Sequence, residues 1–222
     1  ADEGLFTINA STGALSFVTA PNFESPSDAG GNNVYDVQVT VSDGSLTDTQ
    51  DIAVSVTNVN DAVRLTSDGG PDSASISVVE NTTAVTTVTS VDIDANANAI
   101  YSIVGGADAA LFLIDPLSGK LRFISAPNYE NKLDAGADNI YDVTVQVSDG
   151  SLTDTQNIQV TVNDVNDAPI MTANSGSPIE ISIDENTTEA IDVITAADDD
   201  GQTLTYSISG TDAALFNIDS TT

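Results

Sequence analysis

Apolar and polar residues alternate along several segments of this chain. Residues 141–147 (YDVTVQV) place an apolar side chain at every second position, and residues 158–162 (IQVTV) repeat the pattern. A period of two predicts strands that bury one face. Val, Ile, Thr and Tyr dominate these runs, and no stretch has a convincing helical period. The pattern therefore predicts an all-β protein.

Short turn sequences separate the alternating segments. Ser118-Gly119 and Asp149-Gly150 are typical of tight turns between strands, because glycine readily adopts positive φ. The spacing of the turns gives about seven short strands in roughly 105 residues, which is typical of an immunoglobulin-like sandwich. We therefore predict Greek-key β-sandwiches. The chain has no Cys, which excludes the antibody variant with an inter-sheet disulfide.

The sandwich pattern recurs as an internal repeat. Residues 5–62 align without a gap with residues 111–168, and more than half of the aligned positions are identical. A second, looser match joins SVVENTTAVTTV (77–88), with the segment from Val91, to SIDENTTEAIDVI (182–194), with the segment from Ala197. The predicted organisation is a row of sandwiches stacked end to end, with three segments: the C-terminal part of one repeat (1–62), a complete repeat (63–168) and the N-terminal half of a third (169–222).

Both ends of the sequence fall inside a repeat. We expect either a window cut from a longer array or a polymer of this chain. In the polymer, the half-repeat 169–222 of one chain completes the half-repeat 1–62 of the next by strand complementation. The partner is in either case the same protein or an adjacent repeat.

The charge of the chain excludes several functions. Asp and Glu number 34 against 4 Lys and Arg, so the net charge is -30, and His is absent. Such a chain repels phosphate, so a nucleic-acid partner is not expected. Without His or Cys, catalysis by a nucleophile and a base is not expected either. No apolar run is long enough for membrane insertion. Hydrophobic residues make up 40% of the chain and are patterned, which favours folding over disorder.

The acidic residues gather at loops and repeat boundaries. Carboxylate, amide and backbone oxygens are the ligands that Ca²⁺ takes, whereas zinc and copper prefer the absent His and Cys. Simpler roles stay open at this point. The acids of these loops can form a solvated surface, and Asp149 can serve its turn alone.

The same short motifs occupy these boundaries in successive repeats. A glutamate begins ENTT at Glu80 and Glu185, another ends APNFE and APNYE, and the linkers read NVNDA (58–62) and DVNDA (164–168). With the acids of VDID (91–94) and DDD (198–200), these motifs resemble the cadherin fold, in particular the bacterial cadherin-like tandem repeats of large surface and secreted proteins.

The resemblance implies Ca²⁺ bound at each junction between repeats. For the first junction it implies the ligands Glu24, Asn60, Asp61, Asp92, Asp94 and Asp149. For the second junction it implies Glu80, Glu130, Asp164, Asn166, Asp167, Asp198 and Asp200. Asn58 stands where the family has Asp in the linker, and Asn22 and Asn128 replace the Asp of the APNxE motif, so we expect fewer or weaker ions than the family usually holds.

The expected function is that of a structural extender. The repeats would form part of an extracellular bacterial surface adhesin, fibre or sheath, with Ca²⁺ stiffening the junctions. The alternative is a carbohydrate-binding or cell-cell adhesive module with a glycan ligand. That alternative predicts exposed aromatic residues in one repeat that the other repeats lack.

Overall fold

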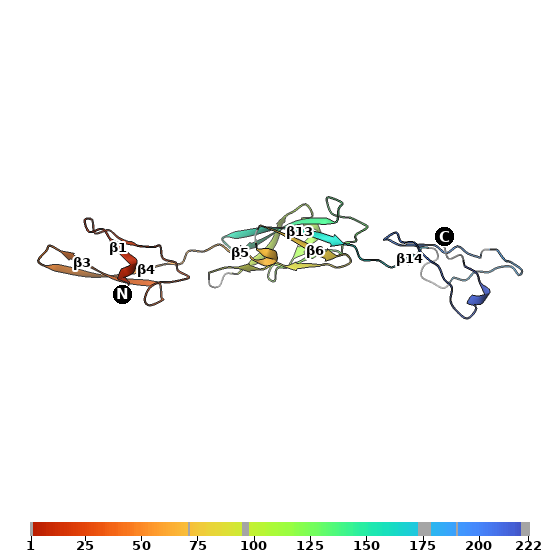
Figure 1. Cartoon of the computed structure of the whole chain (residues 1–222), viewed down its shortest axis with the longest axis horizontal. Coiled ribbons are helices and arrows are strands. Elements are labelled where there is room, and N and C mark those ends of the chain that lie inside the picture. The colour runs from red at the N-terminus through yellow and green to blue at the C-terminus, as the bar shows by residue number, and fades with distance from the viewer. Residues whose placement is uncertain (1, 71, 95–97, 173–178, 190, 219–222) are drawn as a thin grey trace.

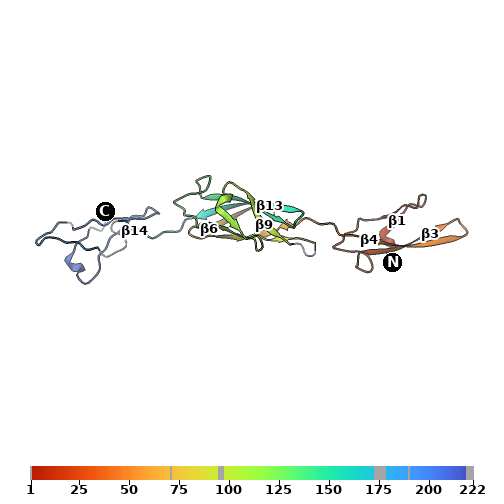
Figure 2. The same cartoon turned by 180° about the vertical axis from the view of Figure 1, so that it is seen from behind.

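The protein is an extended row of three parts (Figure 1), and the view from behind shows the same order (Figure 2). This computed structural model describes residues 2–70, 72–94, 98–172, 179–189 and 191–218. We call residues 2–62 the first part, 63–168 the central repeat and 169–218 the third part. The helices are short 3₁₀ turns at Glu3–Leu5 (η1), Ser67–Gly69 (η2), Ala109–Leu111 (η3) and Ala213–Leu215 (η4).

One sheet of the central repeat has four strands. In order across the sheet they are β6 (Ser73–Val79), β13 (Thr153–Asn163), β12 (Ile140–Ser148) and β9 (Ile100–Gly105). β12 is antiparallel to both of its neighbours, whereas β6 runs parallel to β13. The hairpin of β12 and β13 turns at Asp149-Gly150, as the sequence predicts.

The second sheet has three antiparallel strands. They are, in order, β10 (Phe112–Ile114), β11 (Lys120–Phe123) and β7 (Ala84–Thr87). A further short pair, β5 (Arg64–Leu65) with β8 (Ser90–Val91), lies beside the sheets.

The core lies between these two sheets. Val145 and Val160 of the four-stranded sheet are fully buried, and Phe123 of the other sheet packs edge-on against Tyr141 with ring centroids 5.1 Å apart. The inward positions of β12 are the alternating apolar residues of the sequence. The central repeat therefore confirms the predicted β-sandwich.

The first part has only half of this arrangement. β1 (Phe6–Ile8) pairs with β2 (Leu15–Phe17), and β3 (Val34–Ser42) pairs with β4 (Thr47–Ser55). The β3–β4 register is that of β12–β13, since Tyr35 faces Val54 as Tyr141 faces Val160. The strands that would cover this hairpin are not present in the first part.

The third part contains the opposite half of the repeat. β14 (Ile170–Met171) pairs with β15 (Ala196–Ala197), as β5 pairs with β8 in the central repeat. Among the described residues of the third part, none joins the buried hydrophobic side chains of the protein. Most of its large apolar residues are exposed instead, among them Ile181, Val193 and Leu215.

Some acids organise loops rather than the junctions. Asp134 is buried and accepts hydrogen bonds from the backbone N–H groups of Asp138 (2.8 Å) and Asn139 (3.0 Å). Burial alone would raise the pKa of Asp134, but these backbone donors lower it below its ordinary value. Asp28 binds the corresponding loop of the first part in the same way. Asp134 and Asp28 therefore hold loops within the repeats rather than the junctions.

Candidate metal centres at the domain junctions

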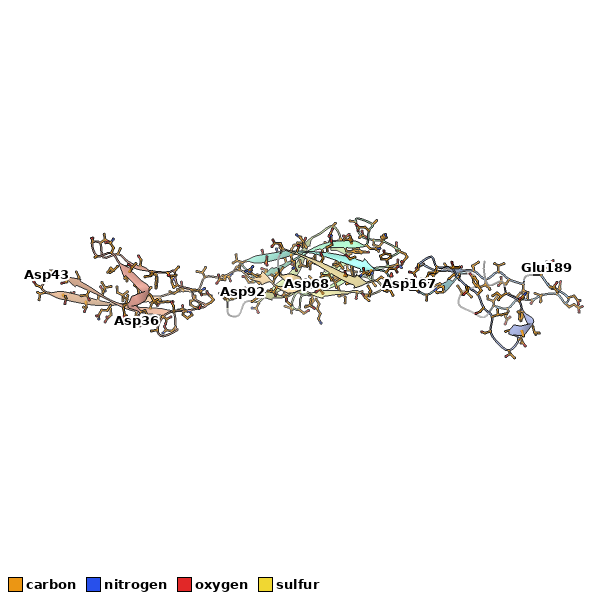
Figure 3. All side chains as sticks on the ribbon, viewed as in Figure 1. Asp36, Asp43, Asp68, Asp92, Asp167 and Glu189 are labelled. Carbon is orange, nitrogen blue, oxygen red and sulfur yellow. The ribbon has the colours of Figure 1, made fainter. Side chains whose placement is uncertain are left out.

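The first junction joins the linker after β4 to the central repeat. Glu24 comes from the loop after β2, Asp61 from the linker, and Asp94 from the loop after β8. One carboxylate oxygen of each lies within 4.8 Å of those of the other two. Figure 3 shows Asp92 of the same loop at the boundary between the first part and the central repeat.

Short hydrogen bonds hold the linker against this loop. The backbone N–H of Asp61 donates to Asp94 Oδ2 (2.7 Å), and the backbone N–H of Asp94 donates to Asp92 Oδ1 (2.9 Å). The side-chain amide of Asn58 donates to Asp94 Oδ1 (2.8 Å). Asn58 therefore offers its amide nitrogen where the second linker has a carboxylate.

Asp149 reaches the first junction from the opposite end of the β12–β13 hairpin. Its Oδ2 accepts a hydrogen bond from Asn60 Nδ2 (2.9 Å), while Oδ1 accepts from the backbone N–H groups of Ser151 and Leu152 (both 2.7 Å). The Leu152 donor, the Asn60 amide and the Ser151 donor lower the pKa of Asp149. Asp149 therefore accepts hydrogen bonds from both the turn and the junction.

Among the residues that the structure describes, two buried oxygens of the first junction have no hydrogen-bond partner. They are Glu24 Oε1 and Asp92 Oδ2. A buried carboxylate oxygen without a donor is costly in a folded protein. A hard cation that takes oxygen ligands removes this cost, so the donor set fits Ca²⁺.

Glu80 occupies the centre of the second junction. It follows β6, is only 1% exposed, and accepts hydrogen bonds from the backbone N–H groups of Tyr129 and Val165 (both 2.8 Å). Carboxylate oxygens of Glu80, Glu130 and Asp164 lie within 4.8 Å of one another. The end of β6, the APNYE loop and the linker therefore meet at one point.

At the second junction, the linker bonds to the third part through the same pair of backbone hydrogen bonds that the first junction has. The backbone N–H of Asp167 donates to Asp200 Oδ2 (2.7 Å), and that of Asp200 donates to Asp198 Oδ1 (3.1 Å). These are the counterparts of the bonds among Asp61, Asp94 and Asp92. Figure 3 shows Asp167 at the boundary between the central repeat and the third part.

The carboxylates of the second junction repel one another. Burial raises the pKa of Glu130, and the charges of Glu80, Asp164 and Asp200 raise it further. Burial and the neighbouring Asp200 and Glu80 likewise raise the pKa of Asp164. Burial and the charges of Glu80, Asp200 and Asp199 also raise the pKa of Asp167. Raised pKa values at several acids of one cluster mark a site whose charge is not compensated within the chain.

The structure thus brings the predicted residues of each junction together. At the first junction, hydrogen bonds and close carboxylate oxygens link the six predicted residues, which are Glu24, Asn60, Asp61, Asp92, Asp94 and Asp149. Hydrogen bonds, close carboxylate oxygens and charge interactions likewise link the seven predicted residues of the second junction. Their role as metal ligands stays a prediction.

Two contacts at the second junction were missed in the sequence. Asn81 has φ of 60°, and its amide donates to Asp167 Oδ1 (3.1 Å). Gln202 donates to the side-chain oxygen of Asn166. The recurrence of Asn after Glu80 and Glu185 was a usable signal for the first contact, because Asn tolerates the left-handed conformation better than most residues.

Comparison with known proteins gives the family. The family model of the cadherin domain matches residues 74–163, which span both sheets of the central repeat. The central repeat is a cadherin domain. Human Protocadherin Fat 1 is 30% identical to the chain over 232 aligned residues, covering 98% of the chain, and rabbit Cadherin-16 is 29% identical over 68% of the chain. The chain spans 5% and 19% of the lengths of these cadherins.

Solved cadherin structures have the same fold. Mouse cadherin-23 EC22–24 superposes with a TM-score of 0.55 at 22% identity, covering 98% of the chain and 69% of that structure. Drosophila N-cadherin EC1–4 gives a TM-score of 0.53 at 22% identity, covering 100% of the chain and 55% of that structure. Tandem immunoglobulin-like sandwiches are therefore confirmed.

The cadherin domain gives the class of the central repeat. Cadherin domains are extracellular adhesion modules rather than enzymes, as expected from the sequence. In the described ranges, no helix is both long and apolar enough to cross a bilayer. The four relatives named above come from animals, so the expected bacterial source stays a prediction.

Proposed function

We propose that this chain is a structural extender in an extracellular adhesin, fibre or sheath, whose junctions are held straight by Ca²⁺. Repeat boundaries lie after residues 62 and 168, where the two linkers make equivalent contacts. The observation that carries the proposal is the pair of carboxylate clusters, Glu24–Asp61–Asp94 and Glu80–Glu130–Asp164, one at each boundary.

Charge explains why an ion is needed at these places. Carboxylates a few ångströms apart repel one another, and the raised pKa values of Glu130, Asp164 and Asp167 are the local expression of this repulsion. Ca²⁺ would replace the repulsion by coordination, since it takes about six to eight oxygen ligands. Because the ligands come from both sides of each linker, coordination would fix one repeat relative to the next.

The two junctions should differ in affinity. Asn58 occupies the position of Asp164 and donates its amide to Asp94, so the first junction has one carboxylate fewer there. Ca²⁺ affinity depends on the number of charged ligands. We therefore expect the second junction to bind more tightly than the first.

Calorimetric titration with Ca²⁺ tests the proposal. The chain should bind with saturable stoichiometry, and Asp167→Asn should lower the affinity of the second junction about tenfold or more, because a charged ligand is lost. Asp36→Asn is the matched control, since Asp36 is an exposed carboxylate of β3 outside both clusters. Equal titration curves for the two variants would count against the assignment.

The alternative of a glycan-binding module has no specific support among the described aromatic residues. Phe216 is 56% exposed, but its counterpart Phe112 belongs to the core of the central repeat. Its exposure therefore reflects the incomplete third part. Phe23 has an aromatic counterpart, Tyr129, in the central repeat, so neither residue is specific to one repeat.

The proposal includes head-to-tail association of chains. The first part displays the uncovered half of a sandwich, and the third part displays the segments that form the covering half in the central repeat. A longer array and a polymer would use the same contacts.

A further inference from the structure

The outer face of the second sheet of the central repeat carries two of the 4 Lys and Arg residues of the chain. β11 reads KLRF, and its alternation turns Lys120 and Arg122 outward while Leu121 and Phe123 are buried in the core. In the described ranges, neither Lys120 nor Arg122 forms an ion pair with a carboxylate. Two cations of a strongly acidic chain are thus available to an acidic partner.

Leu113 and Asp115 lie beside these cations along the neighbouring strand. Leu113 of β10 faces Arg122 of β11, and the backbone N–H of Asp115 donates to the carbonyl oxygen of Lys120 (3.0 Å). Residues that face each other on adjacent strands have Cβ atoms about 5 Å apart. Leu113 is 43% exposed, and Asp115 is exposed as well. The four residues therefore form two adjacent rows, Leu113–Arg122 and Asp115–Lys120, which we call the β10–β11 face.

The carboxylate of Asp115 is held in a fixed position at the end of this face. Its Oδ1 accepts hydrogen bonds from the backbone N–H groups of Ser118 (2.8 Å) and Leu117 (3.0 Å). The hydrogen bonds from Ser118 and Leu117, together with the nearby charge of Lys120, lower the pKa of Asp115. The β10–β11 face therefore presents one fixed negative charge beside two positive charges and an exposed leucine.

The first part has the same pair of strands without this chemistry. β1 and β2 pair in the register of β10 and β11, since Phe6 faces Phe17 as Phe112 faces Phe123. The four positions of the face are exposed and uncharged there, and they hold Thr7, Asn9, Ala14 and Ser16. The strand pair therefore forms without these charges, which leaves them available for a role outside the fold of the repeat.

The two rows of the face are complementary to themselves. A second copy turned over about an axis along the strands, midway between β10 and β11, places its Lys120 on Asp115 of the first copy. The same rotation places Leu113 on the side chain of Arg122, whose alkyl stem packs well on an apolar residue. Each contact occurs twice, because a two-fold interface uses the same residues of both chains. Among these four residues, no two like charges then face each other.

We propose that the β10–β11 face binds the same face of a second copy, so that two chains lie side by side. Charge complementarity identifies this partner, because each face supplies the anion and the cations that the other needs. The strands run along the row (Figure 1), so the paired chains point in the same direction. The net charge of -30 opposes association at long range. Salt at about 0.15 M screens such charges beyond roughly 8 Å and affects contacting ion pairs less.

Sedimentation equilibrium of the purified 222-residue chain tests the pairing. The wild type should show a monomer–dimer equilibrium, and Asp115→Asn should weaken the dimer about tenfold or more, because both ion pairs are lost. This variant keeps the turn, since the counterpart Asn9 accepts the same two backbone hydrogen bonds, from Ser11 and Thr12 (both 3.0 Å). Asp43→Asn is the control, because Asp43 accepts equivalent turn hydrogen bonds on the β3–β4 hairpin.

Lys120→Ala tests the other half of the ion pair. The counterpart of Lys120 is Ala14, so the strand accepts alanine, and the dimer should again weaken about tenfold or more. Arg64→Ala is the control, since Arg64 is an exposed cation of β5 outside the face. Non-specific repulsion predicts the opposite pattern. Asp115→Asn would then strengthen association, and Arg64→Ala would weaken it as much as Lys120→Ala.

Crosslinking through introduced cysteines identifies the face in contact, because the chain has no Cys of its own. An equimolar mixture of Leu113→Cys and Arg122→Cys chains should give a crosslinked dimer with a short bis-maleimide, in higher yield than either variant alone. Thr7→Cys mixed with Ser16→Cys is the matched control, since these two residues face each other on β1 and β2.

A wild-type chain that stays monomeric at every concentration would overturn the pairing, as would equal crosslinking in the two mixtures. A monomer that binds polyglutamate through Lys120 and Arg122 would assign the face to a different acidic partner and would also overturn it. Because the face contains no predicted metal ligand, the dimer should be the same with calcium and with chelator. Failure of the Ca²⁺ proposal in calorimetry would therefore leave the pairing untouched.

Discussion

At the residue scale, Glu80 connects three segments through one buried carboxylate. Its oxygens accept from backbone N–H groups of the APNYE loop and of the linker, beside the acids of the second junction. The glutamate is thus part of the fold of the repeat as well as of the candidate metal site. Stability measured with and without calcium distinguishes these two roles.

Replacing Glu80 by Gln should lower the free energy of unfolding by about 1–3 kcal/mol in chelator, because the amide nitrogen would face a backbone donor. The loss should be larger in Ca²⁺, because a charged ligand is also removed. Denaturant unfolding in both conditions measures these differences. Glu180→Gln, at an exposed position of the third part, is the control and should have no effect. Wild-type stability for Glu80→Gln would contradict the assigned role.

The raised pKa values of Glu130, Asp164 and Asp167 predict how calcium binding depends on pH. Each of these acids keeps its proton to higher pH in the folded junction than in the unfolded chain. Without calcium, their contribution to stability is therefore present at low pH and lost as pH rises through the raised pKa values.

Ca²⁺ needs the ionised carboxylates, so its affinity should fall as pH is lowered through the same window. This window begins above the ordinary carboxyl pKa of about 4. Calorimetry at about pH 5 in buffers of different ionisation enthalpy should register proton release on binding. Equal affinities at about pH 5 and pH 7 would contradict the prediction.

The linker and loop motifs allowed most junction residues to be predicted, because acids at fixed spacing occur at the same place in each repeat. Asn81 was not predicted, because its contact with Asp167 depends on a left-handed backbone conformation. The role of Asp134 was not predicted for a related reason. Its partners are backbone N–H groups of its own loop, which residue types do not reveal.

At the element scale, the long strands were predictable and the short ones were not. β12 alternates from Tyr141 to Val147 and β13 from Ile158 to Val162, whereas β5, β8, β14 and β15 have two residues each and no period to detect. Identical alternation in β3 and β12 also concealed a difference in burial. Sequence pattern shows which face of a strand is apolar, while coverage depends on neighbouring strands elsewhere in the chain.

Gly119 gives a prediction about how the elements pack. Gly119→Ala should destabilise the central repeat by several kcal/mol, since its Cβ would collide with the Val88 backbone. Gly150→Ala has comparable positive φ but open space around the Cβ, so it should cost only about 1 kcal/mol. Thermal unfolding of the two variants compares these costs. An equal loss in both would show that the backbone conformation, not the packing, requires glycine at position 119.

At the scale of the whole molecule, the acids act at two places along an extended row. The core cluster of the described residues lies in the central repeat, and the two groups of junction acids lie at its two ends. Cadherin membership agrees with such a modular array. One sandwich sets the distance between successive junctions. The end-to-end length of the array therefore depends on how far each junction can bend.

Small-angle scattering of the chain, at dilutions where the profile no longer changes with concentration, tests the central claim most directly. In Ca²⁺ the maximum dimension should be that of a straight row of three parts. Chelation should shorten the average dimension and broaden its distribution, because the repelling carboxylates release the linkers. An identical scattering profile with calcium and with chelator would contradict the account.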